Sequence, residues 1–535
     1  MKKIVDKVLE KYPAKTFKTR KKHIIVKDDS YEIPQIEANT RTIPGIITNR
    51  GCCFAGCKGV VVGPIKDMVH IVHGPIGCAY YTWGTRRNKA KTEEGKDNFI
   101  EYCFSTDMQE SDIVFGGEKK LRQAIKEAMD LFNPKAISIS ATCPVGLIGD
   151  DINAIAAEAE KQYGIQVLAF NCEGYKGVSQ SAGHHIANNN FIKNVIGKGD
   201  KEYKKTWNIN LLGEYNIGGD TWEIERILNK IGYNIVATLT GDESLENIRN
   251  AHKADLNLVQ CHRSINYIAE MIETKYGIPW VKVNFIGIDA TIQTLRDMAK
   301  IYDDPELTKR TEEVIAEEIA AIEGELVYLR QRLEGKTAFL YVGGSRSHHY
   351  QNLLATFGIE TVLSGYEFAH RDDYEGRDVI PSIKPDADSK NIEELKVEKD
   401  KENYRIILSE ERYEKLKEEV PNLGEYAGLI KESKKNNIII DDLNHYETET
   451  FIKVLKPDMF FSGIKDKYAV QKMGVMAKQL HSYDYSGPYA GFKGAVIFAK
   501  DVLAGVYTPG WRYVTPPWKT EPLIEGTIEK EGAAC

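Results

Sequence analysis

Short apolar runs alternate with longer amphipathic stretches along most of the chain, and polar loops rich in glycine separate them. The apolar runs predict strands at residues 136–140, 166–170, 209–212, 234–238, 256–259, 337–342 and 459–461. The amphipathic stretches predict helices at residues 121–132, 150–162 and 309–333. Strands that are linked through helices run parallel, so the pattern predicts an α/β fold with parallel, doubly wound sheets.

Several residues with metal-binding or anion-binding side chains directly follow the predicted strands. They are Cys143, Cys261, Arg346 and Lys465. Ligands of doubly wound sheets bind in the crevice at the carboxyl ends of the strands. We therefore expect these side chains to lie at ligand-binding edges of the sheets.

One segment departs from the strand–helix pattern. Of the 30 residues from Asn391 to Val420, 17 are charged, so we expect the segment to contribute no core and to lie on the surface. We expect the whole charged surface insertion to span about residues 383–435. Its function is open from the sequence, and contact with a partner is one possibility.

Composition narrows the class of protein. The chain has 535 residues, 42% hydrophobic and 28% charged, which is ordinary for a globular protein and long enough for several lobes. A net charge of −7 argues against a nucleic-acid partner. The start MKKIVDKVLEKYP has no apolar signal region, and no apolar run approaches the ~18 residues of a membrane span. The nine cysteines are then expected to be reduced, in a cytoplasmic protein with no membrane partner.

The stretch from Arg50 to Arg87 concentrates four cysteines, at positions 52, 53, 57 and 78, among glycines and prolines. Glycines at this density let the backbone approach a bulky group closely. The paired C-x2-C spacing of zinc sites is absent, which favours an iron–sulfur cluster. Buried, reduced thiols in a tight loop remain an equal alternative on these residues alone.

Long motifs in this stretch carry a resemblance. RGC-x-x-AG-x-KGVV (residues 50–61), GPIKDM (63–68) and HGPIGC (73–78) are similar to the α-chain family of nitrogenase molybdenum–iron proteins, and further matching blocks continue to about residue 515. The resemblance implies three Rossmann-like lobes with the cofactor buried between them. The ranges expected on this basis are an N-terminal arm at 1–40, a first lobe at 41–205, a second at 206–350 and a third at 351–535.

The resemblance assigns two sets of metal ligands. It implies that Cys52, Cys78 and Cys143, with three cysteines of a β chain, hold the P-cluster (8Fe-7S), while Cys53 and Cys57 take no part. It further implies that Cys261 and His481 are the two side-chain ligands of the iron–molybdenum cofactor (7Fe-Mo-9S-C) with homocitrate. By themselves, a lone cysteine and a lone histidine are more often packed core residues.

The resemblance also implies a set of residues that surround the iron–molybdenum cofactor without ligating its metals. Arg86 and Arg346 would direct guanidinium groups at cluster sulfurs, and Gly343 and Gly344 would present backbone N–H groups where a side chain does not fit. Lys465 matches a position near homocitrate.

The remaining implied residues line the substrate side. Gln180 matches a position near homocitrate, and His184 one that is hydrogen-bonded to a cofactor sulfur and could relay protons. Val60 matches the residue that guards the iron face, and Tyr215 and Ser264 match further lining positions. The implied catalytic residues are Val60, Gln180, His184 and Arg86.

The activity that the resemblance implies is ATP-coupled reduction of dinitrogen to ammonia with hydrogen release, by an α2β2 heterotetramer. Electrons would come from a separate iron protein that docks near Phe115. The chain itself is expected to bind no ATP: Gly335-Lys336-Thr337 lacks the upstream glycine of a P-loop, since Arg330 stands there, and it precedes its strand.

Three other members of the superfamily are alternatives. A cofactor-assembly scaffold should lack His481 and part of the arginine set. The α chain of a vanadium or iron-only nitrogenase is disfavoured by GVVVGPIKDM and by the insertion, which resembles the clostridial form. A light-independent chlorophyll-pathway reductase should have no counterpart of Cys261 and His481.

Overall fold

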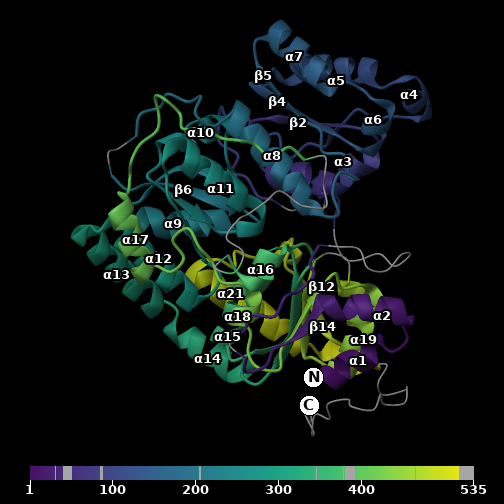
Figure 1. Ribbon diagram of the computed structural model, residues 1–535, viewed down its shortest axis with the longest axis vertical. Coiled ribbons are helices and arrows are strands. Elements are labelled where there is room, and N and C mark those ends of the chain that lie inside the picture. Colours follow the sequence, from purple (N-terminus) through teal and green to yellow (C-terminus); the bar gives the residue numbers. More distant parts are fainter. Residues whose placement is uncertain are drawn as a thin grey trace.

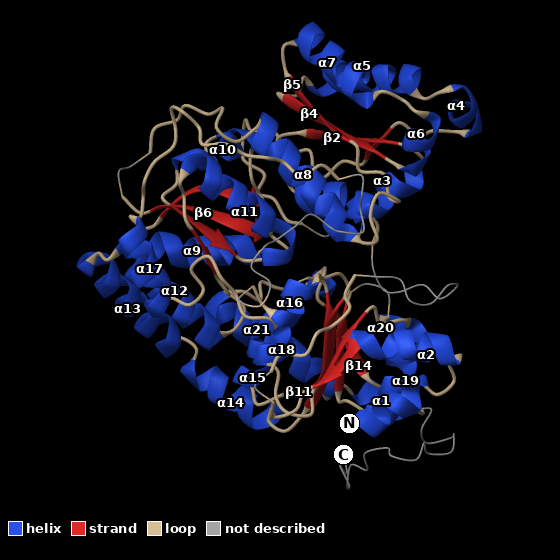
Figure 2. Cartoon of the chain, in the orientation of Figure 1, coloured by secondary structure: helices blue, strands red, loops and turns tan. Residues whose placement is uncertain are grey.

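The structure is a computed structural model that describes residues 1–30, 32–39, 51–84, 88–203, 206–344, 346–377, 379, 392–463 and 466–516. Three separate β-sheets form the centres of three lobes, and helices cover the faces of each sheet (Figures 1 and 2). All strand pairs between named strands are parallel except one at a sheet edge. The predicted α/β class with parallel sheets is therefore confirmed.

The first lobe has a four-stranded sheet in the order β3-β2-β4-β5. Its strands are β2 (Val69–His73), β3 (Phe104–Ser105), β4 (Ala136–Ala141) and β5 (Gln166–Phe170). Its helices are η2 (Ala55–Val62), α3 (Ile76–Gly84), α4 (Glu110–Phe115), α5 (Glu118–Phe132), α6 (Cys143–Ile148) and α7 (Ile152–Tyr163). Helices α5 and α7 cover one face of the sheet and share a buried apolar cluster with it (Figure 1).

The second lobe has a four-stranded sheet in the order β7-β6-β8-β9. Its strands are β6 (Asn208–Glu214), β7 (Asn234–Thr240), β8 (Leu256–Val259) and β9 (Trp280–Lys282). Its helices are α8 (Gln180–Asn194), α9 (Asp220–Ile231), α10 (Leu245–Arg249), η3 (Ala251–Lys253), α11 (His262–Tyr276), α12 (Ile288–Tyr302), α13 (Pro305–Ala320) and α14 (Glu323–Leu333). Helix α8 lies between this lobe and the first (Figure 1).

The third lobe has a six-stranded sheet in the order β1-β12-β11-β10-β13-β14. Its strands are β1 (Ile24–Val26), β10 (Thr337–Val342), β11 (Glu360–Tyr366), β12 (Ile438–Asp441), β13 (Met459–Ser462) and β14 (Met476–Gln479). Its helices are α1 (Lys2–Leu9), α2 (Ala14–Arg20), η1 (Lys21–His23), α15 (Arg346–Thr356), α16 (Arg371–Glu375), α17 (Glu410–Glu419), α18 (Leu429–Glu432), α19 (His445–Leu455), α20 (Lys467–Lys472), η4 (Tyr483–Tyr485), α21 (Gly491–Val506) and η5 (Pro509–Tyr513).

The sheets divide the chain differently from the expected ranges at two places. Strand β10 pairs with β11 and β13 in the third sheet, although residues 206–350 were assigned to the second lobe. The N-terminal segment adds β1 to the same sheet, antiparallel to β12, and buries the apolar face of α1 against it. The first residues of the chain are thus part of the third lobe.

The predicted helix at 309–333 is two helices, α13 and α14, with a break at Ala321 and Ile322. The apolar stripe continues through the break, since Ile315, Ile322 and Leu329 are all buried. Gly324 stands in the first turn of α14, and glycine disfavours helix by about 1 kcal/mol relative to alanine. The stripe therefore predicted the buried face correctly but missed the break.

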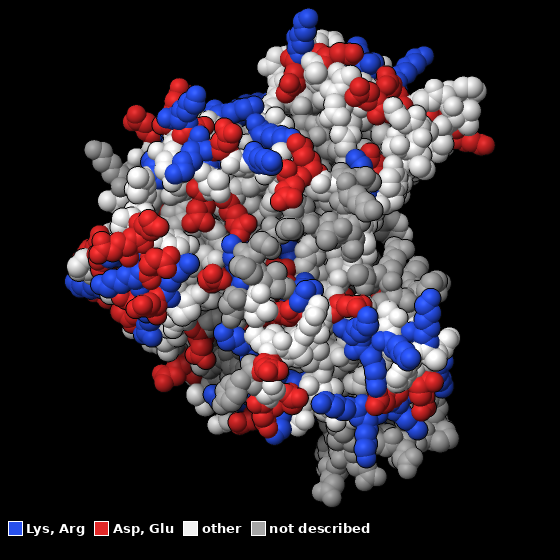
Figure 3. All heavy atoms as spheres, in the orientation of Figure 1, with Lys and Arg blue, Asp and Glu red and all other residues white. Residues whose placement is uncertain are grey.

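The expectation that the charged insertion contributes no core was wrong. Leu416, Val420, Leu423 and Tyr426 are buried and belong to the main core cluster. The charged residues of α17 are exposed or half-buried, while its Leu416 is buried. The helix is therefore amphipathic, and the high proportion of charged residues masked its apolar side in the sequence. Figure 3 shows acidic and basic side chains mixed over this edge of the molecule.

The insertion also pairs with the outer edge of the second sheet. The N–H of Lys282 in β9 donates to the carbonyl of Asn422 (3.0 Å), and the N–H of Gly424 donates to the carbonyl of Trp280 (2.9 Å). Further back along the insertion, the Arg405 guanidinium pairs with Asp255 at 3.0 Å. The segment is therefore a strap that leaves the third lobe and is fixed along the second.

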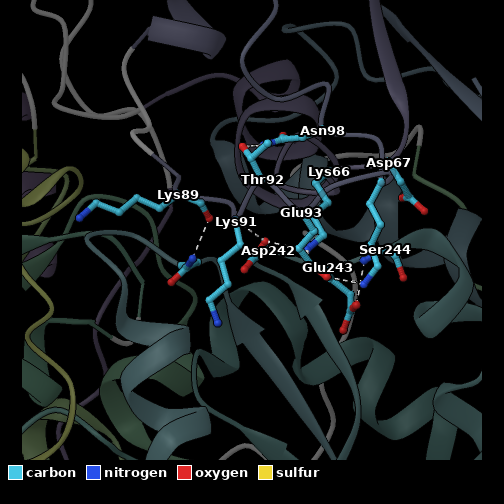
Figure 4. A network of polar contacts seen from close by, with 12 residues as sticks. Lys66, Asp67, Lys89, Lys91, Thr92, Glu93, Asn98, Asp242, Glu243 and Ser244 are labelled. Carbon is cyan, nitrogen blue, oxygen red and sulfur yellow. Dashed lines mark hydrogen bonds and ion pairs between the residues drawn. The ribbon is translucent and has the colours of Figure 1, made fainter. Parts of the chain in front are cut away.

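A polar network joins the first lobe to the second (Figure 4). The Lys66 ammonium lies 3.0 Å from Asp242 Oδ1 and 3.5 Å from Glu93 Oε1. The N–H of Leu245 donates to Asp67 Oδ1 (2.8 Å). These contacts hold the segment after η2 against the loop after β7. Within the described residues, no helix has the length and apolar character to cross a membrane.

Candidate metal centres

Three of the predicted metal ligands, Cys52, Cys78 and Cys143, lie together on the first lobe. Cys143 opens α6 directly after β4, Cys78 lies on α3 after β2, and Cys52 precedes η2. A Cβ added to Gly174 would lie 3.0 Å from Cys143 Sγ and 3.3 Å from Cys52 Sγ, so both sulfurs flank this glycine. The pKa of Cys78 is raised, mainly by burial and further by Cys52 and Cys143.

Exposure distinguishes these thiols from three other cysteines of the same lobe, although Cys103, outside the predicted set, is exposed as well. Cys52 and Cys143 are exposed and Cys78 is half-buried, whereas Cys53, Cys57 and Cys172 are buried. Burial raises the pKa of all three buried thiols, and Cys57 is hydrogen-bonded to Cys172. These three thiols are therefore packed inside the first lobe.

The open side of the three thiols fits a cluster that is shared with another chain. Among the described residues, no three His, Cys, Asp or Glu side chains converge on a position for a single metal ion. Two outward-facing thiolates and a third beside them leave coordination positions for ligands from elsewhere. Soft thiolate donors suit iron–sulfur clusters.

The second candidate centre lies where the second and third lobes meet. Cys261 follows β8 and caps α11, and His481 follows β14. Both border the Gly343–Gly344 turn after β10: Cys261 Sγ is 3.4 Å from the Gly344 carbonyl oxygen, and a Cβ on Gly343 would lie 2.9 Å from His481 Nε2. One dipeptide therefore contacts both predicted ligands.

The two glycines are required by close packing. A Cβ on Gly343 would also lie 2.6 Å from Phe368 Cε1, and one on Gly344 would lie 2.5 Å from Arg263 Cγ. Contacts this short are not tolerated, so only glycine fits at these two positions. The packing thus excludes a side chain at both positions, while their backbone N–H contacts to a cluster remain a prediction.

Buried charges stand beside this turn. Arg346, which opens α15, is 9% exposed, and its Nη2 lies 3.3 Å from Glu214 Oε2. Its Nη1 is buried and has no hydrogen-bond partner among the described residues. Burial raises the pKa of Glu214 to about 7, although Arg346 opposes this shift. A buried guanidinium edge without an acceptor fits an anionic group beside it, because an unpaired buried donor is unfavourable.

Helices η2 and α8 cross with almost no space between them. A Cβ on Gly56 would lie 2.0 Å from the Gln180 carbonyl oxygen, and one on Gly183 would lie 2.0 Å from the Cys53 carbonyl oxygen. This crossing brings Val60 of η2, buried at 4% exposure, next to the helix that carries Gln180 and His184. Helix η2 is a π-helix, a form that is frequent at functional sites.

Of the two polar predicted residues on α8, His184 is buried and Gln180 is half-buried. Gln180 Oε1 is buried and has no hydrogen-bond partner among the described residues. His184 is fully buried, and its ring centroid lies 5.6 Å from that of Phe368, the residue that also packs against Gly343. Gln180 and His184 thus belong to one helix, and His184 is linked to the Gly343–Gly344 turn through Phe368.

Tyr215 and Ser264 are joined by a hydrogen bond. The Tyr215 hydroxyl donates to Ser264 Oγ (2.6 Å), and Ser264 Oγ donates to the Cys261 carbonyl oxygen (3.2 Å). Both predicted lining residues therefore lie beside Cys261. The predictions for Arg86 and Lys465 fall outside the described residues.

Three residues at these centres were missed in the sequence. Gly174 separates the sulfurs of Cys52 and Cys143, Glu214 pairs with Arg346, and Glu367 Oε2 lies 3.3 Å from His481 Nε2. Glu214 ends β6 and Glu367 directly follows β11. The rule that ligand-site residues follow strands could have found both carboxylates. Gly174 gives no such signal.

Thiols grouped on an open face, together with a buried cysteine and a half-buried histidine at one turn, define an iron–sulfur type of redox protein. Comparison with known proteins agrees with this class. The family model of nitrogenase component 1 type oxidoreductases matches residues 52–507. The chain belongs to this family.

Within the family, the chain is similar to nitrogenase molybdenum-iron protein alpha chains. That of Clostridium pasteurianum is 64% identical over 515 residues, 96% of each chain. That of Methanosarcina barkeri is 56% identical over 519 residues, 97% of each chain. The solved structure of nitrogenase Cp1 at pH 6.5 superposes with a TM-score of 0.93 at 64% identity, covering 96% of this chain and 100% of that one. The resemblance seen in the sequence is confirmed, and the chain is an oxidoreductase.

Proposed function

We propose that the chain is the catalytic α subunit of a molybdenum nitrogenase, which reduces dinitrogen to ammonia with release of hydrogen. The observation that carries the proposal is the position of Cys261 and His481. They come from the ends of strands in different sheets, yet both border the Gly343–Gly344 turn. The same pair argues against the assembly scaffold and the chlorophyll-pathway reductase, which are expected to lack it.

Cys261 and His481 would hold the iron–molybdenum cofactor, with Gln180 and Lys465 near its homocitrate. When bound, the cofactor supplies the metal sites at which electrons reach dinitrogen. The chain's own residues would orient the cofactor and exclude other groups from its surroundings. The Gly343–Gly344 turn leaves no space for a side chain between the two ligands, and the apolar Val60 limits access on the η2 side.

Charge and proton supply come from buried side chains. The unpaired Nη1 of Arg346 would donate to an anionic sulfide surface, and Arg86 would add a second guanidinium. The imidazole of His184, on the neighbouring helix α8, would hold a proton for delivery at the sulfide edge. Tyr215 and Ser264 fix the backbone carbonyl of Cys261 through their hydrogen bonds.

On the first lobe, Cys52, Cys78 and Cys143 would hold half of the P-cluster, and three cysteines of a β chain would hold the other half in an α2β2 heterotetramer. The half-buried thiol and the two exposed ones support this sharing.

The tip of the first lobe is the candidate docking site of the iron protein, which would hydrolyse ATP and deliver electrons. Ile113, Val114 and Phe115 of α4 are 41%, 66% and 87% exposed. Figure 3 shows few charged side chains at this tip. Contiguous apolar side chains at such exposure indicate a surface that a protein partner covers.

Replacement of the two proposed cofactor ligands tests the function. In purified heterotetramer, Cys261→Ala and His481→Ala should each remove molybdenum and the cofactor's paramagnetic signal while the P-cluster iron stays. Cys103→Ala, an exposed cysteine outside both sets, is the matched control and should keep both. A retained signal in either ligand variant would refute the assignment, and vanadium in the wild-type protein would identify the alternative nitrogenase.

A further inference from the structure

A second cavity of about 440 Å³ lies on the other side of η2 from α8, and the candidate metal centres do not use it. Its walls come from η2, β2, α3, the loop at 88–102 and α9 of the second lobe. The volume lies within the roughly 300–1,000 Å³ of small-molecule sites. The cavity therefore has the size of a ligand pocket between two lobes.

Lys58 supplies an unneutralised charge to this pocket. Its side chain lines the cavity, is 8% exposed, and makes no hydrogen bond or ion pair with any described residue. Burial lowers the pKa of Lys58 to about 8, and only Cys103 opposes the shift. The Lys58 ammonium faces the cavity and no other described side chain pairs with it, so a carboxylate in the cavity would stabilise its charged form.

The neighbouring His70 cannot be that partner. Its Nε2 lies 2.8 Å from the Ile65 carbonyl oxygen, which can only accept, so this nitrogen carries the proton. Its Nδ1, 2.8 Å from Ser138 Oγ, then accepts from the hydroxyl. Burial lowers the pKa of His70 to about 3, so the ring is neutral and both its nitrogens are engaged. The charge of Lys58 is left for a ligand.

Asn98 adds an acceptor at the same pocket. Its amide nitrogen donates to Thr92 Oγ1 at 3.4 Å, as Figure 4 shows. Its Oδ1 is buried and has no hydrogen-bond partner among the described residues. A ligand for this pocket therefore needs a hydrogen-bond donor in addition to an anionic group.

Three aromatic rings also line the cavity, together with one further cation, Lys89, and one carboxylate, Glu101. Trp83 and Tyr102 line the cavity and are 39% and 52% exposed, so they stand at its mouth. Trp222 lines it from the second lobe; its indole N–H donates to Asp242 Oδ2 at 2.6 Å, and the Lys91 ammonium lies 5.4 Å from its ring centroid, so one part of the ring is already covered. Such rings favour a flat or aromatic ligand body.

We propose that this pocket binds a small, flat organic anion that carries a carboxylate for Lys58 and a hydroxyl donor for Asn98. The site is separate from both metal centres and does not depend on the activity proposed above. It is a binding site for an aromatic hydroxycarboxylate at the junction of the first and second lobes.

Calorimetric titration of the purified native assembly with 4-hydroxybenzoate tests the proposal. Neutral 4-hydroxybenzamide, which has the same shape, should bind at least about tenfold more weakly because it lacks the charge-assisted bond. Lys58→Met should weaken 4-hydroxybenzoate by a similar factor, and Asn98→Leu should remove the preference for 4-hydroxybenzoate over benzoate. Lys96→Met, at an exposed lysine outside the pocket, is the control for net charge and should leave binding unchanged.

If Lys58→Met does not fold, the proposal is tested by comparing the affinities of the unaltered protein for 4-hydroxybenzoate and 4-hydroxybenzamide. Equal affinity for the two ligands, or absence of saturable binding, would overturn the proposal. A structure of the soaked assembly should place the carboxylate at Lys58 Nζ. A side chain of a partner subunit in that position would overturn it as well.

Discussion

The two candidate metal centres of this chain are built in opposite ways. On the first lobe, three thiols lie on an open face, two of them exposed, and a buried carboxylate next to them, Glu173, pairs with Lys176 at 2.8 Å. Between the second and third lobes, Cys261 and His481 border a turn that is enclosed by buried Arg346 and Glu214. The first-lobe centre, which a second chain would complete, is exposed. The centre that this chain positions alone is enclosed by buried charged side chains and by close packing.

The largest effect should come from filling the enclosed centre. Gly343→Ala places a methyl group 2.6 Å from Phe368 and 2.9 Å from His481 Nε2, so the ligand has to move. We expect loss of most of the molybdenum with the first-lobe iron retained, measured by elemental analysis, and a destabilisation of about 1–3 kcal/mol in thermal unfolding. Gly324→Ala, with open space around it, is the control. Full molybdenum content in Gly343→Ala would show that the turn does not restrict the centre.

A smaller effect is expected at the open centre. In Gly174→Ala the methyl group would lie 3.0 Å from Cys143 Sγ and 3.3 Å from Cys52 Sγ, distances that a slight shift of exposed side chains can relieve. Part of the P-cluster iron should be lost, and association with the second chain should weaken, as followed by native mass spectrometry. Molybdenum loss greater than iron loss would contradict the separation of the two centres.

The last effect is on folding stability and concerns the junction that joins the lobes. Burial raises the pKa of Glu243 to about 7, above its usual value of 4.5. The folded state therefore binds more protons than the unfolded state between these values, and stability falls as pH rises through that window and levels off above about pH 7. Relative to Glu243→Gln, the wild-type chain should lose up to about 3 kcal/mol across the window. Parallel unfolding curves of the two proteins from pH 4.5 to 8 would exclude this role.

The sequence predicted the repeated strand–helix units well, because buried parallel strands are continuous apolar runs. It failed where structure depends on a distant partner. The short β1 forms only by pairing with β12, and Leu416 of the strap is core only because the second lobe lies beneath it. At the sites, the motifs predicted the thiols and the glycine turn, but the contact of Gly174 with two cysteines joins residues far apart in sequence. A local sequence pattern does not predict such a contact.

The strap has a consequence for how the chain folds during synthesis. Strand β9 is an outer strand of the second sheet, and its free backbone groups are satisfied by residues 422–424. Unpaired strand edges promote aggregation. The ribosome must therefore add about 140 further residues after β9 before residues 422–424 can cover that edge. During this interval a chaperone would have to shield the edge of the nascent sheet.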